Sequence, residues 1–228
     1  MPIERFFDSD LTAEDKEGQL EGDQMHHALK VFRLGVGDHL EIINGHGLLA
    51  HCLITEISKK NLRYQVIKTH LEKRGLPKTV LILGMPKFNR LEFIIEKVCE
   101  LGCDKITLFN ADRSEKVDLS PNQLDRLNLL LQAALKQCGR LFLPSLELRS
   151  SLDQCFEQDY TYYYGHIETK EKLPLAIKNQ AGIVIGPESG FSDKEKALLS
   201  TKAHPISLSD AVLRVDTAAI CAVCLLRS

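Results

Sequence analysis

Residues 183–191 read IVIGPESGF. The β-branched run at the start of this stretch predicts a buried strand, which ends where Gly186 and Pro187 begin a loop. The next four residues, SDKE at 192–195, form a capping box, so we expect a helix to begin at about Ser192. A second apolar run, Pro205–Leu208, follows that helix. Two strand ends therefore lie close together in the sequence, separated by one helix.

The loop at 186–190 is the first candidate for a ligand site. In open α/β sheets the ligand crevice lies beyond the carboxyl ends of the strands, where loops and helix N-termini present free backbone groups. Gly186 and Gly190 would let the backbone pass close to a ligand or adopt a positive φ. The pentapeptide alone is equally compatible with a plain turn.

Length and composition set outer bounds on the fold. With 228 residues, the chain can hold one large or two small domains without disulfides. The 29 Lys and Arg residues nearly balance the 31 Asp and Glu residues, so a polyanion must be met by a local patch of charge. Because no apolar run is long enough to span a membrane and no leader is recognisable, we expect a soluble, cytoplasmic protein.

The 7 cysteines are odd in number and scattered, which is typical of free thiols in a reducing compartment. Cys221 and Cys224 form the one CxxC pair, with no second pair and no histidine close by in the sequence. We therefore expect no metal site and interpret the pair as small residues on the buried face of the last helix.

Residues 1–74 are expected to form a small β-barrel domain. Alternating segments at 40–47, 50–57 and 62–67 predict antiparallel strands, and Met25–Leu34 predicts a short helix. The section from 59 to 78 carries seven Lys and Arg residues against one acid. It is either a surface that follows phosphates or an ordinary solvated edge, and residues 74–77 are interpreted as a linker.

Residues 75–228 are expected to form an α/β domain, because strands and helices alternate and such alternation implies a parallel sheet covered on both faces. The expected strands are 79–85, 106–110, 160–167, 183–185 and 205–208, and the expected helices are 90–101, 120–139, 173–179, one from about 192, and 216–226. Gly102 is expected to cap the first helix and Ser120-Pro121 to begin the second.

The common nucleotide and nucleophile motifs GxGxxG, GxxxxGK[ST] and GxSxG do not occur in this chain. Several polar residues are explained neither by a core nor by a cap: Lys87, Arg90, Arg113, Gln137, Arg140, Glu188, Arg214 and Asp216. Arg214 is the most informative, because a cation just before a helix N-terminus does not complement the helix dipole. It either serves a ligand or pairs with Asp216 or Glu188, and the local sequence leaves both possibilities open.

Two stretches carry a resemblance to a known family: IGPESGFS at 185–192 with Glu195, and Leu208 followed by VLRVDTA at 212–218. They are similar to the C-terminal signature of the bacterial small-subunit rRNA uridine-N3 methyltransferases of the SPOUT superfamily. Further similarity extends over nearly the whole chain, at His26-His27, Val31, Arg33, Gly37-Asp38, Lys87, Arg90, Glu96-Lys97, Glu100–Gly102, Arg113-Ser114, Ala133-Ala134, Gln137, Arg140 and Pro144.

The resemblance implies a PUA-like β-barrel for RNA, followed by an α/β domain whose C-terminal segment is threaded into a trefoil knot. It also implies that the knot loops hold S-adenosylmethionine (SAM) at a homodimer interface, and that the reaction methylates N3 of a specific uridine in small-subunit (16S) rRNA. The implied cofactor positions are Gly186, Pro187, Glu188, Gly190, Leu208, Leu213, Arg214 and Thr217. The implied RNA-binding positions are Arg33, Lys87, Arg90, Arg113, Gln137 and Arg140.

The implied reaction also suggests roles for two side chains. Uridine N3 must lose its proton, so a base or a cation that stabilises the uracil anion is needed. We expect Arg214 to orient the target base or to offset its developing charge, with Glu188 as the alternative proton acceptor.

The chain departs from the family pattern at four positions. Ser189 and Ser209 stand where the family usually has glycine, Asp216 where it usually has glutamate, and Asn89 where an acid is common. A Cβ at either serine is tolerable only if that residue avoids positive φ. These departures keep a second class of function open, a non-catalytic RNA-binding or ribosome-assembly factor that retains the fold.

Overall fold

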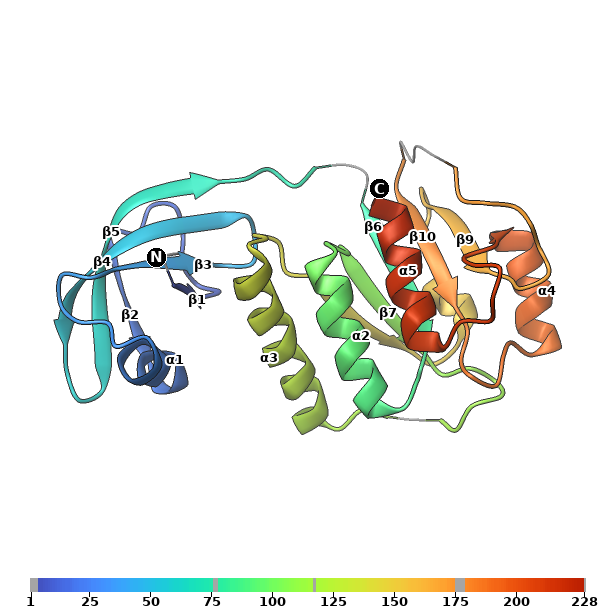
Figure 1. Ribbon diagram of the computed structural model, residues 1–228, viewed down its shortest axis with the longest axis horizontal. Helices are drawn as coiled ribbons and strands as arrows, with labels where there is room; N and C mark the ends of the chain where they lie inside the picture. Colours follow the sequence, from blue (N-terminus) through green and yellow to red (C-terminus); the bar gives the residue numbers. More distant parts are fainter. Residues whose placement is uncertain (1–3, 76–77, 117, 175–178, 228) are drawn as a thin grey trace. The chain divides into compact units, whose positions relative to one another are not determined.

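The computed structural model describes residues 4–75, 78–116, 118–174 and 179–227. The chain divides into two compact units (Figure 1): residues up to Arg74 together with Leu135–Leu143, and Gly75–Ala134 together with the residues from Pro144 onward. Residues 135–143 were not part of the first domain expected from sequence. They join it because the turn at 45–47 holds them: Gly47 N–H donates to the Leu141 carbonyl at 2.9 Å, and Leu143 N–H donates to the Gly45 carbonyl at 2.8 Å.

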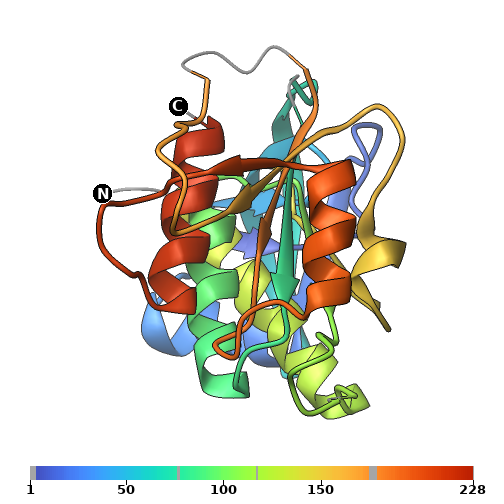
Figure 2. The same ribbon diagram turned by 90° about the vertical axis from the view of Figure 1, so that its right-hand side faces the viewer.

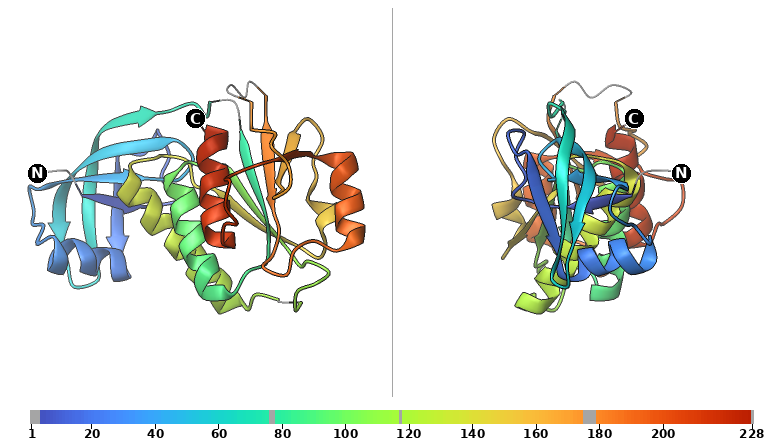
Figure 3. Two further views of the ribbon diagram at one scale, coloured as in Figure 1. Left: turned by 45° about the vertical axis from the view of Figure 1, so that its right-hand side comes forward. Right: turned by 90° about the vertical axis from the view of Figure 1, so that its left-hand side faces the viewer.

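The first unit is built on a mixed sheet, which has five strands among the described residues, in the order β1-β3-β4-β5-β2. Its elements are β1 (Arg5–Phe7), β2 (Glu17–Glu21), α1 (Gly22–His26), the π-helix η1 (His27–Val31), β3 (His39–Ile43), β4 (Leu48–Ile57) and β5 (Asn61–Leu71). The sheet is curled (Figure 3). Its core includes Phe6, Leu40, Ile54 and Tyr64. The expected small β domain is confirmed.

Two features of this unit differ from the sequence-based expectation. The helix expected at Met25–Leu34 begins earlier, at Gly22, and continues as the π-helix η1, in which Phe32 N–H donates to the His27 carbonyl at 3.2 Å. Arg33 then leaves the helix with a φ of 55°. β1 and β2 were not predicted, because β1 has only three residues and β2 has a single buried side chain, Leu20.

The second unit is an α/β domain. Within the described ranges its sheet has six strands, all pairings are parallel, and the order is β11-β9-β10-β6-β7-β8. Its elements are β6 (Thr79–Gly84), α2 (Phe88–Glu100), β7 (Lys105–Phe109), α3 (Pro121–Cys138), β8 (Ser145–Arg149), the 3₁₀ helix η2 (Leu152–Cys155), β9 (Thr161–Gly165), β10 (Ala181–Ile185), α4 (Asp193–Lys202), β11 (His204–Ile206) and α5 (Val215–Arg227). The end of α3, from Leu135 onward, belongs to the first unit. The expected α/β class with a parallel sheet is therefore confirmed, and β8 is an addition.

Helices cover both faces of this sheet, as Figure 2 shows. α2 and α5 pack against each other, and α5 lies against β6 and β10. α4 and η2 lie on the opposite face, where Leu199 and Leu152 join one apolar cluster with Val80 and Tyr162. Every residue of β6 and β10 is buried, as expected for central parallel strands.

The predicted helix signals are confirmed where the structure describes them. Ser192 and Glu195 form a capping box at the start of α4, and Gln123 N–H donates to the Ser120 hydroxyl at the start of α3. Gly102 ends α2 with a φ of 84°. The helix expected at 173–179 falls largely on residues 175–178, which lie outside the described residues.

Candidate functional site

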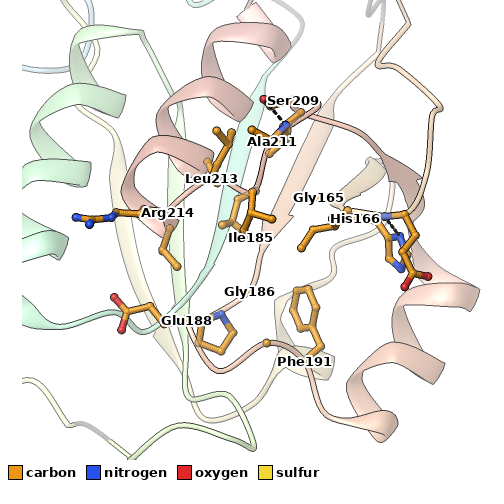
Figure 4. Close-up of a pocket in the computed structure, with 18 of the residues that line it drawn as sticks. Gly165, His166, Ile185, Gly186, Glu188, Phe191, Ser209, Ala211, Leu213 and Arg214 are labelled. Carbon is orange, nitrogen blue, oxygen red and sulfur yellow. Dashed lines mark hydrogen bonds between the residues drawn. The ribbon is translucent and has the colours of Figure 1, made fainter.

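A cavity of about 840 Å³ lies at the carboxyl ends of β9, β10 and β11. Three loops line it, at 165–168, 185–191 and 208–215, together with Arg90 of α2 and Lys196 of α4 (Figure 4). The two strand ends that the sequence analysis singled out, before residues 186 and 208, are joined here by a third, before residue 166. The volume falls within the range of sites that enclose a whole small ligand.

One part of the cavity wall is apolar and is formed largely by loop residues. Ile185, Phe191 and Leu213 line it (Figure 4), and so does Leu208. Gly186 is required here, because a Cβ at this position would lie 2.9 Å from the Phe191 ring. An apolar wall beside exposed loop backbone suits a flat aromatic group that also carries hydrogen-bonding edges.

The base of α4 fixes the loop at 186–191 from its far end. Ser192 N–H donates to the buried carboxylate of Glu195 at 2.7 Å, and Glu195 N–H donates to the Ser192 hydroxyl at 3.1 Å. Glu195 also accepts from Asp112 N–H at 3.1 Å, and the Ser192 hydroxyl donates to the Asp112 carboxylate at 2.6 Å. The capping box therefore ties the loop after β7 to the end of the cavity loop.

The two arginines that line the cavity, Arg90 and Arg214, differ in whether they form an ion pair. Arg90 forms an ion pair with Glu188. Arg214 is exposed, and its guanidinium has no ion-pair or hydrogen-bond partner among the described residues. Asp216 instead accepts from Thr217 N–H at 2.8 Å. The alternative in which Arg214 pairs with Asp216 or Glu188 is therefore wrong for this structure.

Comparison with known proteins assigns the family. A family model described as an RNA methyltransferase domain matches residues 74–227, which is more than half of the chain. This chain belongs to that RNA methyltransferase family. A second model, described as an RNA methyltransferase PUA domain, matches residues 20–67 of this RNA methyltransferase.

Individual relatives agree with this assignment. The chain is 29% identical over 207 residues to the ribosomal RNA small subunit methyltransferase E of Helicobacter pylori, covering 89% of this chain and 90% of that protein. Its structure is similar to that of a candidate methyltransferase from Legionella pneumophila in complex with the bound cofactor SAM, with a TM-score of 0.88, 26% identity, and coverage of 99% of this chain and 97% of that one. The small-subunit rRNA methyltransferase E of Neisseria gonorrhoeae, at 19% identity and a TM-score of 0.84, shares the fold over 97% of this chain and 95% of its own.

Most of the cofactor positions implied by the resemblance line the cavity of this RNA methyltransferase. They are Gly186, Pro187, Glu188, Gly190, Leu208, Leu213 and Arg214. Thr217 is exposed on α5 and is not among the lining residues. The site residues expected from sequence did not include Phe191 or His166, although each directly follows a glycine at a predicted loop.

The six RNA-binding positions implied by the resemblance fall into three groups. Lys87 and Arg113 are exposed in the second unit, where Arg113 lies 3.8 Å from the Asp193 carboxylate. Arg33, Gln137 and Arg140 belong to the first unit. Arg90 differs from the rest, because it lines the cavity and is already paired with Glu188.

The two serine departures are compatible with the loops of this methyltransferase. Among the described residues, the non-glycine residues with positive φ are Arg33 and Asp159, so neither Ser189 nor Ser209 is strained by its Cβ. The Ser189 hydroxyl lies 3.3 Å from that of Ser114 and forms a hydrogen bond with it.

The interpretation of the CxxC pair as buried is wrong for Cys224. Cys224 is exposed and Cys221 is partly buried, because the buried face of α5 is formed by Val215, Ala219, Ala222, Val223 and Leu226. Within the described part of the chain, no cluster of His, Cys, Asp and Glu is placed to hold a metal ion. The same residues contain no helix with the length and apolar character needed to cross a bilayer.

Proposed function

We propose that this protein transfers the methyl group of SAM to N3 of a uridine in small-subunit rRNA. The observation that carries the proposal is a cavity of about 840 Å³ in a chain of the RNA methyltransferase family, lined by an arginine, Arg214, that has no partner among the described residues. The relative from H. pylori is named as a small-subunit rRNA methyltransferase, and the similar structure from L. pneumophila holds SAM.

The residues of the cavity fit the cofactor. The apolar wall of Ile185, Phe191 and Leu213 accepts an adenine ring, and the backbone of loops 186–190 and 208–213 offers N–H and C=O groups to its edges. Gly190, with a φ of 72° and no atom within 4 Å of an added Cβ, gives this loop its turn. The proposed contacts with SAM are Gly186, Pro187, Glu188, Gly190, Leu208 and Leu213.

When bound, SAM supplies an electrophilic methyl group and a neutral thioether leaving group, so the transfer itself requires no metal. Arg214 is proposed to orient the uracil and to stabilise the negative charge that develops as N3 loses its proton. The Arg214 guanidinium is exposed and has no partner in the part of the chain that the structure describes, so it is available for this role. The carboxylate of Glu188, which also lines the cavity, is the candidate acceptor of the N3 proton.

A uridine in folded RNA exposes its N3 edge only after it leaves the base stack. We propose that the first unit, which matches a PUA domain, holds the surrounding RNA through phosphate contacts. The proposed contacts are the exposed side chains of Lys87, Arg113 and Gln137, together with Arg33 and Arg140. The same proposal includes a homodimer, a C-terminal segment threaded into a trefoil knot, and action in the cytoplasm.

Two measurements test the proposal. Calorimetric titration of the protein with SAM should give saturable binding, and a deletion strain should lack one N3-methyluridine that mass mapping of its small-subunit rRNA detects in the parent. The purified protein should restore that mark in vitro. Binding of RNA without binding of SAM would instead identify an RNA-binding or assembly factor, and an unchanged rRNA methylation pattern would refute the assigned substrate.

A further inference from the structure

An ion pair at the edge of the cavity connects two segments that are distant in the sequence. Arg90 lies in the first turn of α2, and Glu188 lies in the loop after β10. The two side chains keep 31% and 42% of their surface exposed, so the pair is partly shielded from water. Figure 4 shows Glu188 and Arg214 on one side of the cavity and Phe191 and His166 on the other.

We propose that Arg90 is a positioning residue for the cofactor loop rather than a contact for RNA. Its ion pair holds the loop at 186–190 in the shape that receives SAM, and it occupies Glu188 so that Arg214 remains unpaired. This inference rests on the proposed function, because it assigns a role within the same cavity.

The start of α2 is a fixed point from which Arg90 can act. Arg90 N–H and Leu91 N–H both donate to the Lys87 carbonyl at 3.0 Å, and Leu91 and Ile94 are fully buried. The strand before this helix ends at Gly84, where an added Cβ would lie 2.8 Å from Pro187. The end of β6 and the cavity loop are therefore in close contact, and Arg90 reaches Glu188 from the first turn of the helix that follows β6.

The loop itself has few other restraints at its tip. Gly190 N–H donates to the Pro187 carbonyl at 3.0 Å, and Ser189 forms one hydroxyl bond with Ser114 at 3.3 Å. Ser189 and Glu188 are both exposed. Among the described residues, the tip of the loop is therefore held by these two hydrogen bonds and by the ion pair between Arg90 and Glu188.

The pair also determines which cation remains available in the cavity. A carboxylate at position 188 that lost Arg90 would be available to Arg214, which lies on the same side of the cavity in Figure 4. Arg214 would then lose part of its availability to the target base. An arginine that is already paired with a carboxylate is also a weaker partner for a phosphate, so the pairing argues against an RNA contact at Arg90.

The experiment compares wild type with R90Q, E188Q and the double variant, measuring the Kd for SAM, the KM for SAM, kcat, and the KM for rRNA. We expect R90Q to raise the Kd and KM for SAM about three- to fivefold, the upper part of the range for a partly exposed ion pair. We also expect it to lower kcat, because Glu188 becomes available to Arg214, while the KM for rRNA stays the same. The double variant should be no weaker than E188Q alone, because the two side chains act as a pair.

R126Q is the matched control. Arg126 pairs with Glu92, which is another arginine–glutamate pair of the second unit, and neither residue lines the cavity. This variant should leave the Kd for SAM and the KM for rRNA unchanged.

Two results would overturn the inference. One is additive effects of R90Q and E188Q on the Kd for SAM. The other is an R90Q variant with normal SAM binding, weaker rRNA binding and a salt dependence reduced by about one phosphate contact, which would identify Arg90 as an RNA contact. A wild-type protein that binds no SAM would refute the proposed function itself, so the two failures are distinguishable.

Discussion

Replacing Arg214 with alanine is the most direct test of the proposed chemistry. The side chain is exposed and has no internal partner among the described residues, so its removal leaves no buried charge uncompensated. The backbone carbonyl of Arg214 still accepts from Ala218 N–H at 2.8 Å, which preserves the first turn of α5. We therefore expect the free energy of unfolding to change by less than about 0.5 kcal/mol.

The effect on catalysis should be much larger. Loss of one group that stabilises developing negative charge costs about 10²- to 10³-fold in kcat, or roughly 2.7 to 4 kcal/mol of transition-state stabilisation. R214K retains a point charge but not the planar guanidinium, so we expect an intermediate loss of about tenfold.

The assay is single-turnover transfer of a radiolabelled methyl group to rRNA from the deletion strain, with SAM and enzyme in excess. Calorimetry with SAM and thermal unfolding serve as controls for binding and folding. A single-turnover rate constant for R214A within threefold of wild type would refute the role assigned to Arg214, and so would a loss of rate that only parallels a loss of folded protein.

Three further predictions concern the scaffold of the site. E195A should lower the free energy of unfolding by about 2 to 3 kcal/mol, because two backbone N–H groups lose a charged acceptor, and chemical denaturation would measure this. G186A should lower the free energy of unfolding by about 1 to 3 kcal/mol and weaken SAM binding in calorimetry, because its Cβ would lie 2.9 Å from the Phe191 ring. A normal affinity for SAM would contradict the role of the loop at 186–191 in binding it. Burial raises the pKa of Cys103 to about 11 and that of Cys155 to about 12. Because the unfolded thiols ionise near pH 8.5, this contribution to stability should be complete below that pH and decline as the pH rises toward 11 or 12, which urea unfolding at pH 7 and pH 10 would detect.

Signals that act within a few residues were read correctly from the sequence alone. Ser192 with Glu195 and Ser120 at the start of α3 form caps through hydrogen bonds that span three residues. Gly102 adopts the left-handed φ that ends α2. The apolar runs of β6 and β10 predicted buried strands, because a strand buried on both faces needs no alternation. Each of these features depends on the chain's own neighbours, so the order of residues was sufficient.

Features that depend on sheet order were decided by the tertiary structure. The order β11-β9-β10-β6 brings three loops together around one cavity, and the β6–β10 pairing brings α2 close enough for Arg90 to reach Glu188. From the sequence, Arg90 was therefore a candidate for RNA binding, and Arg214 was left either to serve a ligand or to pair with Asp216 or Glu188. Residues 135–143 likewise joined the first unit through backbone bonds to the turn at 45–47. Such contacts link residues far apart in the chain, so no local pattern encodes them, and packing alone determines which charges are paired and which are available for a substrate.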